Sequence, residues 1–83
     1  MNKNELVIAL NMGREIEFSY KEKSYFLTPN YSKQCYYFLE VEDFNGKWKK
    51  IFTGEIDEIL NFKFEGEHSL RDDIKEFEFN YIL

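Results

Sequence analysis

The order of apolar and polar residues predicts a short helix at the start of the chain. Asn2 can cap a helix, and Glu5 lies three residues later, which is the spacing of a capping box. Apolar residues then recur with helical spacing until Gly13, a residue typical of the position after a helix C-terminus. We therefore expect a helix over residues 3–12.

From Glu15 the apolar residues recur at every second position, which is typical of strands with one buried face. This alternation predicts a strand over residues 15–20, a turn at residues 21–22 and a second strand that ends at Pro29. The expected cross-strand pairs are Phe18 with Tyr25 and Ile16 with Leu27.

A third alternating run, residues 34–44, is followed by Asn45-Gly46, a dipeptide typical of a two-residue type I′ hairpin turn. Counting outward from that turn sets the register of the hairpin. The expected pairs are Phe44 with Lys47, Glu42 with Lys49, Val41 with Lys50 and Leu39 with Phe52. The same count places Leu39, Val41, Trp48, Lys50 and Phe52 on one face of the sheet.

Two further helices are predicted in the C-terminal part of the chain. Thr53 can cap a helix over residues 54–61, and residues 62–64 can form a brief strand before a turn. The Ser69-Leu70-Arg71-Asp72 segment resembles a second capping box, and we expect a helix from there to about residue 79. Residues 77–83 fit a strand alternation equally well, so a strand remains the alternative there.

These elements predict a single small α+β domain over residues 1–83. Its parts are an N-terminal helix, a four-stranded antiparallel meander and one or two C-terminal helices packed on one face of the sheet. A length of 83 residues supports one core, and 43% hydrophobic residues are too many for a disordered chain.

Composition narrows the classes of function. No apolar run approaches the roughly 20 residues that span a bilayer, and we expect a cytoplasmic protein. Cys35 and His68 are the only soft metal ligands, so no metal or other cofactor is expected. A net charge of −5 argues against direct binding to nucleic acid or to an anionic membrane, and it favours a basic protein partner.

The negative charge is concentrated in the last third of the chain. Residues 1–50 contain eight basic and seven acidic side chains, whereas residues 51–83 contain three basic and nine acidic ones. On the expected helix, Asp72 and Glu76 lie one turn apart with Phe79 on the same outer side. The candidate partner-binding residues are Asp57, Glu58, Glu65, Glu67, Asp72, Asp73, Glu76 and Phe79.

The same residues can also be interpreted without any binding partner or catalytic role. The carboxylates can simply form a solvated face, and neighbours such as Asp72 and Asp73 point about 100° apart on a helix, which does not make a chelate or a catalytic pair. We therefore expect no enzymatic activity. His68 is expected at a turn or on the surface, and Cys35 is expected as a small core residue.

Tyr31, Tyr36 and Phe38 raise the possibility of an exposed stacking platform of the kind that binds single-stranded nucleic acid. The neighbouring carboxylates Glu40 and Glu42 oppose that use. We expect these aromatic residues to pack in the core or against a helix.

Four segments of the chain carry a resemblance to other proteins, and they are residues 13–20, 23–27, 56–60 and 64–72. Together they resemble small uncharacterised proteins of phages and mobile elements of low-GC bacteria. The composition, with nine lysines and two arginines, also looks like translation of AT-rich codons. The resemblance implies a single-domain accessory protein without catalytic activity, in the size class of anti-CRISPR and other anti-defence inhibitors.

Charge and resemblance predict a stoichiometric inhibitor that occupies a basic, nucleic-acid-binding surface of a bacterial defence protein such as a nucleic-acid-guided nuclease. The alternative is a structural or regulatory module that self-associates through an exposed aromatic sheet face including Tyr36 and Phe38. The sequence leaves the oligomeric state open.

Overall fold

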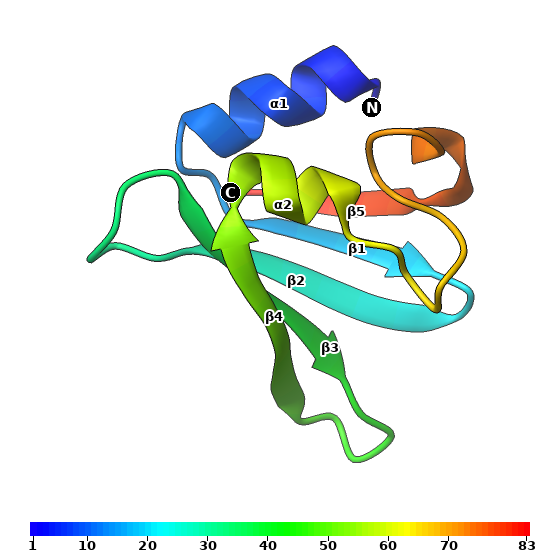
Figure 1. The fold of residues 1–83 in the computed structure, drawn as a ribbon. Helices are drawn as coiled ribbons and strands as arrows, with labels where there is room; N and C mark the ends of the chain where they lie inside the picture. Colours follow the sequence, from blue (N-terminus) through cyan, green and yellow to red (C-terminus); the bar gives the residue numbers. More distant parts are fainter.

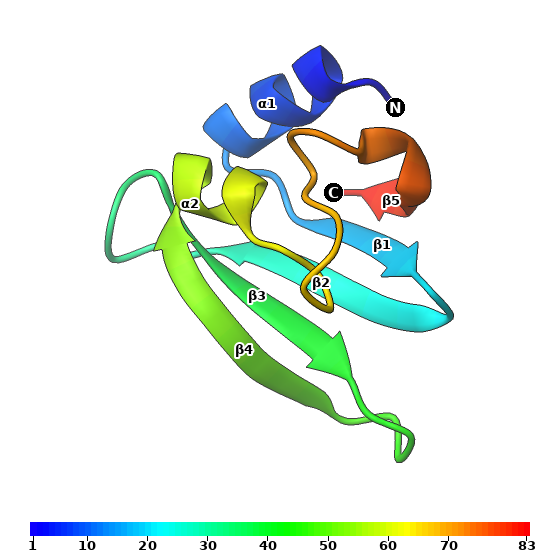
Figure 2. The same cartoon turned by 45° about the vertical axis from the view of Figure 1, so that its right-hand side comes forward.

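The computed structural model describes residues 1–83 as one five-stranded antiparallel sheet with both helices on the same face (Figures 1 and 2). The strand order is β4-β3-β2-β1-β5. The α+β class is confirmed, and the sheet has one strand more than predicted. Neither helix is long and apolar enough to cross a membrane. The elements are α1 (Lys3–Asn11), β1 (Ile16–Tyr20), β2 (Lys23–Pro29), β3 (Tyr36–Glu42), β4 (Trp48–Glu55), α2 (Ile56–Asn61), the 3₁₀ turn η1 (Ile74–Glu76) and β5 (Glu78–Ile82).

The N-terminal helix forms as predicted. The Asn2 side chain accepts from the Glu5 N–H at 2.9 Å, and the Glu5 carboxylate accepts from the Asn2 N–H at 3.0 Å. Gly13 follows the helix with a φ of 73°, a left-handed conformation that glycine adopts without strain. The Tyr37 hydroxyl lies 2.9 Å from the carbonyl of Leu10 and 3.0 Å from that of Arg14, which ties the end of α1 to the sheet.

The β1–β2 hairpin also has the predicted register, with Ile16 opposite Leu27 and Phe18 opposite Tyr25. Its two turn residues, Lys21 and Glu22, have φ values of 48° and 67°. Such conformations are unfavourable for residues other than glycine, and they match the primed turns that suit the twist of a hairpin.

An aromatic core lies between the inner face of the sheet and the segments that cover it. Phe64, which is fully buried, makes edge contacts with Phe18, Tyr25 and Phe77 at centroid distances of 5.6, 5.0 and 5.1 Å. Phe64 and Phe77 belong to the C-terminal third, which crosses the helix side of the sheet (Figure 2). This segment is therefore part of the core.

The β3–β4 turn differs from the prediction. Asp43 donates its N–H to the Lys47 carbonyl at 2.8 Å, and its carboxylate accepts from the N–H groups of Asn45 and Lys47 at 2.9 and 3.0 Å. Gly46 has a φ of 79°, so the loop has three residues instead of the two expected for a type I′ turn. The Asp43 side chain thus selects the longer loop. The predicted pairs Phe44–Lys47, Glu42–Lys49 and Val41–Lys50 are wrong, and the observed pairs are Glu42–Trp48, Val41–Lys49 and Glu40–Lys50.

A bulge in β4 restores the predicted register farther from the turn. Leu39 pairs with Phe52 as expected, but the next pair joins Glu40 to Lys50, which leaves Ile51 as the extra residue. The residues before the bulge therefore change face. Trp48 and Lys50 lie on the outer face, contrary to their predicted place beside Leu39.

The helix α2 begins later than predicted. Thr53 pairs with Phe38, and β4 continues to Glu55 before the chain turns into the helix. The Glu55 N–H is capped by the Glu58 carboxylate at 2.8 Å, so Thr53 does not cap the helix. Residues 62–64 do not form a strand, and only an isolated bridge joins Phe64 to His68.

The predicted helix over residues 70–79 is wrong. Ser69 caps only a turn, accepting the Asp72 N–H at 3.1 Å, and the chain then forms η1 and the strand β5. β5 pairs with the otherwise free edge of β1, and its Phe79 ring lies 5.7 Å from that of Phe18. Sheet pairing and the period-two alternation therefore prevailed over the helical stripe.

Candidate functional site

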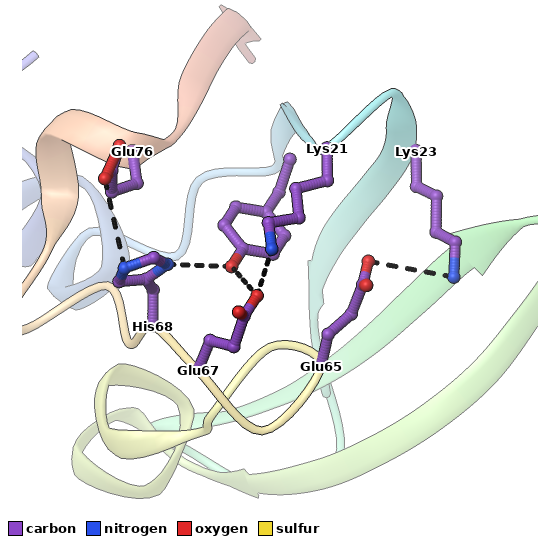
Figure 3. A network of polar contacts seen from close by, with 7 residues as sticks. Lys21, Lys23, Glu65, Glu67, His68 and Glu76 are labelled. Carbon is purple, nitrogen blue, oxygen red and sulfur yellow. Dashed lines mark hydrogen bonds and ion pairs between the residues drawn. The ribbon is translucent and has the colours of Figure 1, made fainter.

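Two groups of carboxylates compete as a functional surface, and the first is the predicted one in the C-terminal third. Glu67 forms an ion pair with Lys21, and Glu65 lies 3.8 Å from Lys23 (Figure 3). Both acidic side chains reach from the turn after α2 to the β1–β2 hairpin. They connect two parts of the same chain.

Tyr20 and His68 complete this network. The Tyr20 hydroxyl lies 2.8 Å from Nδ1 of His68 and donates to Glu67 at 3.2 Å, while Nε2 of His68 lies 3.9 Å from Glu76 (Figure 3). Burial raises the pKa of Tyr20, and the hydrogen bond from Lys21 lowers the pKa of Glu67. The hydroxyl therefore stays protonated and the carboxylate stays ionised at neutral pH. His68 ends the turn of residues 65–67, in line with the prediction of a turn or surface position, and its side chain is half-buried.

Arg71 holds another of the predicted residues. Its guanidinium donates to Asp57 at 3.1 Å and to the Asn61 side chain at 2.7 Å, which fastens the following segment to α2. Asp72 lies 3.9 Å from Lys63. Even so, the Asp57 side chain is 82% exposed, and exposed pairs of this kind contribute little stability.

The remaining predicted residues do not join these pairs. Glu58 caps α2, and Asp73 makes no ion pair. Phe79 points to the inner face and packs against the core, so its expected role as an exposed anchor is wrong. Most of these acidic side chains therefore contact groups of the same chain, and they do not form one free patch.

The second group lies on the outer face of the sheet, which neither helix covers (Figures 1 and 2). Cross-strand pairs join one row of side chains across all five strands. In order from β5 to β4, the row is Tyr81, Glu17, Phe26, Glu40 and Lys50. Aromatic rings and carboxylates therefore alternate along the row until it ends at a lysine.

More aromatic rings flank this row. The ring of Trp48 lies 5.8 Å from that of Phe26, and Lys50 Nζ lies 3.9 Å from the centroid of the Phe38 ring. Tyr36, on the same strand and face, has Lys33 Nζ 3.9 Å from its ring centroid. Tyr36 and Phe38 are thus half-exposed on the uncovered face, and the expectation that they pack in the core or against a helix is wrong.

The carboxylates of the outer face lack cation partners. Glu17, Glu40 and Glu42 are half-buried, and none of them has a basic nitrogen within 4.0 Å. Glu17 interacts instead with Tyr81, whose pKa is raised by a hydrogen bond to that carboxylate. A partly buried carboxylate without a cation has more to gain from an external one than a carboxylate that is already paired.

The alternative of an exposed aromatic sheet face already includes Tyr36 and Phe38, but it leaves out Glu17 and Phe26 because alternation was used only to locate the core. The outward positions include a carboxylate on β1, a ring on β2 and both types on β3, and taken together they indicate the composition of the outer face. Glu17 and Phe26 were available from the predicted β1–β2 register itself.

The structure does not favour a catalytic or metal site at the other candidates. No group of three or more His, Cys, Asp and Glu side chains is arranged to hold a metal ion. Cys35 is exposed in the loop before β3 with a φ of 64°, so its predicted place in the core is wrong. Asp72 and Asp73 line only a shallow surface hollow beside η1.

Comparisons with known proteins add nothing to this geometry. No family model matches the chain, and no curated protein and no solved structure is significantly similar to it.

Proposed function

We propose that this protein is a non-enzymatic binding domain that attaches to a basic surface of a partner protein. The observation that supports it best is the uncovered outer face of the sheet, where aromatic rings alternate with carboxylates that have no cation partner. Rings supply contact area at low entropic cost, and carboxylates select positive charge.

The charge of this face favours a basic partner. Its carboxylates outnumber its basic groups five to two. Because an excess of negative charge speeds encounter with a positively charged surface, the face suits a partner that normally holds nucleic acid. The acidic residues are Glu17, Glu40, Glu42, Glu55 and Glu78, and the basic ones are Lys33 and Lys50.

In this proposal the domain acts by occupancy, as a stoichiometric inhibitor of a bacterial defence protein such as a nucleic-acid-guided nuclease. The resemblance to small phage and mobile-element proteins supports this class of partner. The carboxylates of the C-terminal third form a second, weaker surface, because a partner must first displace their cations within the chain.

Charge reversal on each surface tests the proposal. We expect the wild type to bind and inhibit at least one member of a panel of purified nucleic-acid-guided nucleases from low-GC bacteria, and to bind less tightly as salt is raised. Glu17→Lys with Glu42→Lys is expected to abolish binding, whereas Asp72→Lys with Glu76→Lys weakens it less. Binding that does not respond to salt, or a panel in which no nuclease is bound, contradicts the proposal.

Self-association is the second candidate, and the exposure of Tyr36 and Phe38 on the open face supports it. Sedimentation at two protein concentrations separates the two functions. A stable dimer that Phe38→Ser dissociates favours the self-associating module. A monomer at both concentrations favours the binding domain.

A further inference from the structure

We propose that the outer face takes an arginine side chain of the partner, stacked on Phe26 between Glu17 and Glu40. This inference rests on the proposed function and specifies the chemistry of recognition. It assigns one central position on the sheet to one type of side chain.

The register places the three residues in the geometry that a guanidinium needs. Phe26 on β2 pairs with Glu17 on β1 on one side and with Glu40 on β3 on the other. Adjacent strands lie about 4.8 Å apart, so the two carboxylate-bearing strands are separated by roughly 10 Å. A planar guanidinium can lie on the ring and direct its five N–H donors toward both carboxylates. A lysine offers one compact charge and cannot reach both.

The chain already uses neighbouring rings of this face in the same way. Lys50 sits over Phe38 and Lys33 sits over Tyr36, each at 3.9 Å from the ring centroid. Phe26 lies between the two carboxylates on the same face, and no cation of the chain lies over its ring. Among the outer-face rings without a cation of the chain, Phe26 is the one with a carboxylate on both neighbouring strands, so it is the best placed for an external cation.

Charge also excludes a second copy of the chain as the best occupant. Two outer faces brought together would each add negative charge, and like charges in contact oppose association. Of the two arginines of the chain, Arg71 is engaged by Asp57 on the helix side of the molecule and Arg14 lies beside α1, so neither belongs to the outer face. The arginine therefore comes from a different protein.

The tryptophan of the chain provides a direct measurement. Trp48 is the only tryptophan, and its ring lies 5.8 Å from that of Phe26, so its fluorescence reports on this position. The probe is a capped eight-residue peptide of alternating arginine and serine, titrated at low salt beside its lysine analogue. We expect saturable quenching or enhancement, and an affinity for the arginine peptide at least about 3-fold higher than for the lysine peptide.

Matched substitutions locate the binding. Glu17→Gln with Glu40→Gln is expected to weaken binding of the arginine peptide at least about 10-fold, because both charge-assisted contacts are removed. Asp72→Asn with Glu76→Gln removes the same charge from the other acidic group and is expected to change the affinity less than about 2-fold. Phe26→Leu keeps an apolar side chain without the π-face and is expected to reduce affinity about 3-fold or more.

Two neighbouring lysines give a second matched pair. Lys50 lies opposite Glu40 on the outer face, whereas Lys49 lies opposite Val41 on the inner face. Both Lys→Gln changes remove one positive charge. We expect Lys50→Gln to strengthen peptide binding about 3-fold because a positive charge that repels the guanidinium is lost from the outer face, and Lys49→Gln to have a smaller effect.

Several results would overturn the inference. They are equal affinities for the two peptides, equal losses for the two carboxylate pairs, an unchanged Trp48 signal at millimolar peptide, or peptide-induced amide NMR shifts centred on residues 63–76 of the wild type. The last readout needs no variant, so it decides the question even if a substitution unfolds the protein. Nuclease binding that Glu17→Lys with Glu42→Lys abolishes but Phe26→Leu leaves unchanged would refute the arginine site and leave the proposed function standing.

Discussion

The two acidic groups of this protein differ in what their charges already do. In the C-terminal third, Glu65, Glu67 and Asp57 neutralise cations of the same chain and fasten a long segment to the hairpin and to α2. On the outer face, Glu17 and Glu40 stand beside aromatic rings and neutralise no cation. The segment with the densest negative charge is therefore the one with less of it free for a partner.

This difference has a simple origin in chain geometry. Residues 62–73 form no helix or strand and cross beside the β1–β2 hairpin, so their carboxylates meet the lysines of that hairpin. A strand satisfies its backbone through the ladder, so the side chains on its uncovered face remain available. Whether a carboxylate is free to bind a partner thus depends on the backbone around it as much as on the number of carboxylates in the segment.

The substitution with the largest expected effect on stability tests whether aromatic packing is the main interaction that holds the C-terminal segment on the sheet. Phe64→Ala removes a fully buried ring from the centre of the aromatic core and is expected to lower the free energy of unfolding by about 3–5 kcal/mol. Phe26→Ala, on the outer face, is expected to cost less than about 1.5 kcal/mol. Urea unfolding measures both. Equal losses would mean that the outer face is part of the core.

A smaller effect is expected where the sheet meets the acidic segment. A Cβ added at Gly54 would lie 2.9 Å from Cβ of Glu58 and 3.1 Å from the ring of Phe52, both closer than a normal contact. Gly54→Ala is therefore expected to cost about 1–3 kcal/mol through overpacking between β4 and α2. At Gly66 an added Cβ has no atom within 4 Å, and a φ of 73° makes any loss from Gly66→Ala a backbone effect. A loss from Gly54→Ala below about 0.5 kcal/mol would refute the steric explanation.

Because Glu67 is paired with Lys21, we expect it to make the stability of the protein depend on pH. The unpaired carboxylates of the outer face have no such ion pair to lose. Because the pKa of Glu67 is lower in the folded protein than in the unfolded chain, the unfolded chain binds more protons at acidic pH. The stability from this pair is present above the unfolded pKa and is lost as pH falls through the lowered folded pKa. We expect the difference in unfolding midpoint between wild type and Glu67→Gln to shrink from pH 7 toward acid. In a Lys21→Gln background, Glu67→Gln is expected to have little effect, and a persisting difference there would assign the pKa shift to another contact.

The smallest expected effect belongs to the unpaired group. Glu17→Gln and Glu40→Gln remove no ion pair of the chain, so each is expected to change the free energy of unfolding by no more than about 0.5 kcal/mol. Thermal unfolding of the two variants measures this. A loss well above that value in either variant would show that the carboxylate has a structural partner beyond the contact between Glu17 and Tyr81, and it would remove the contrast between the two regions.

Local patterns predicted the first half of the fold well. The capping box at Asn2, the β1–β2 register and the α+β class all follow from short-range spacing, and each is confirmed. The errors arise where a distant contact decides between two local solutions. The last strand is the main case, because residues 77–83 fit a helix and a strand equally and only the free edge of β1 selects the strand.

The candidate site was less accessible from the sequence for the same reason. Carboxylate density is visible in the sequence, but the lysines that pair with Glu67 and Glu65 come from residues more than 40 positions away. The free carboxylates on the strands are spread thinly along the chain, and they gather only when five strands are laid side by side. Neither fact can be read from a local window.

The bulge at Ile51 has a consequence for how such a surface can change over time. Side chains alternate along a strand, so one surplus residue reverses the orientation of everything between it and the turn. Shortening the loop by one residue would let Ile51 pair with Glu40, which would return the hairpin tip to a regular ladder and transfer its tryptophan to the opposite side. A change in chain length can therefore alter which side chains a partner meets, even when the types of residue in the sequence stay the same.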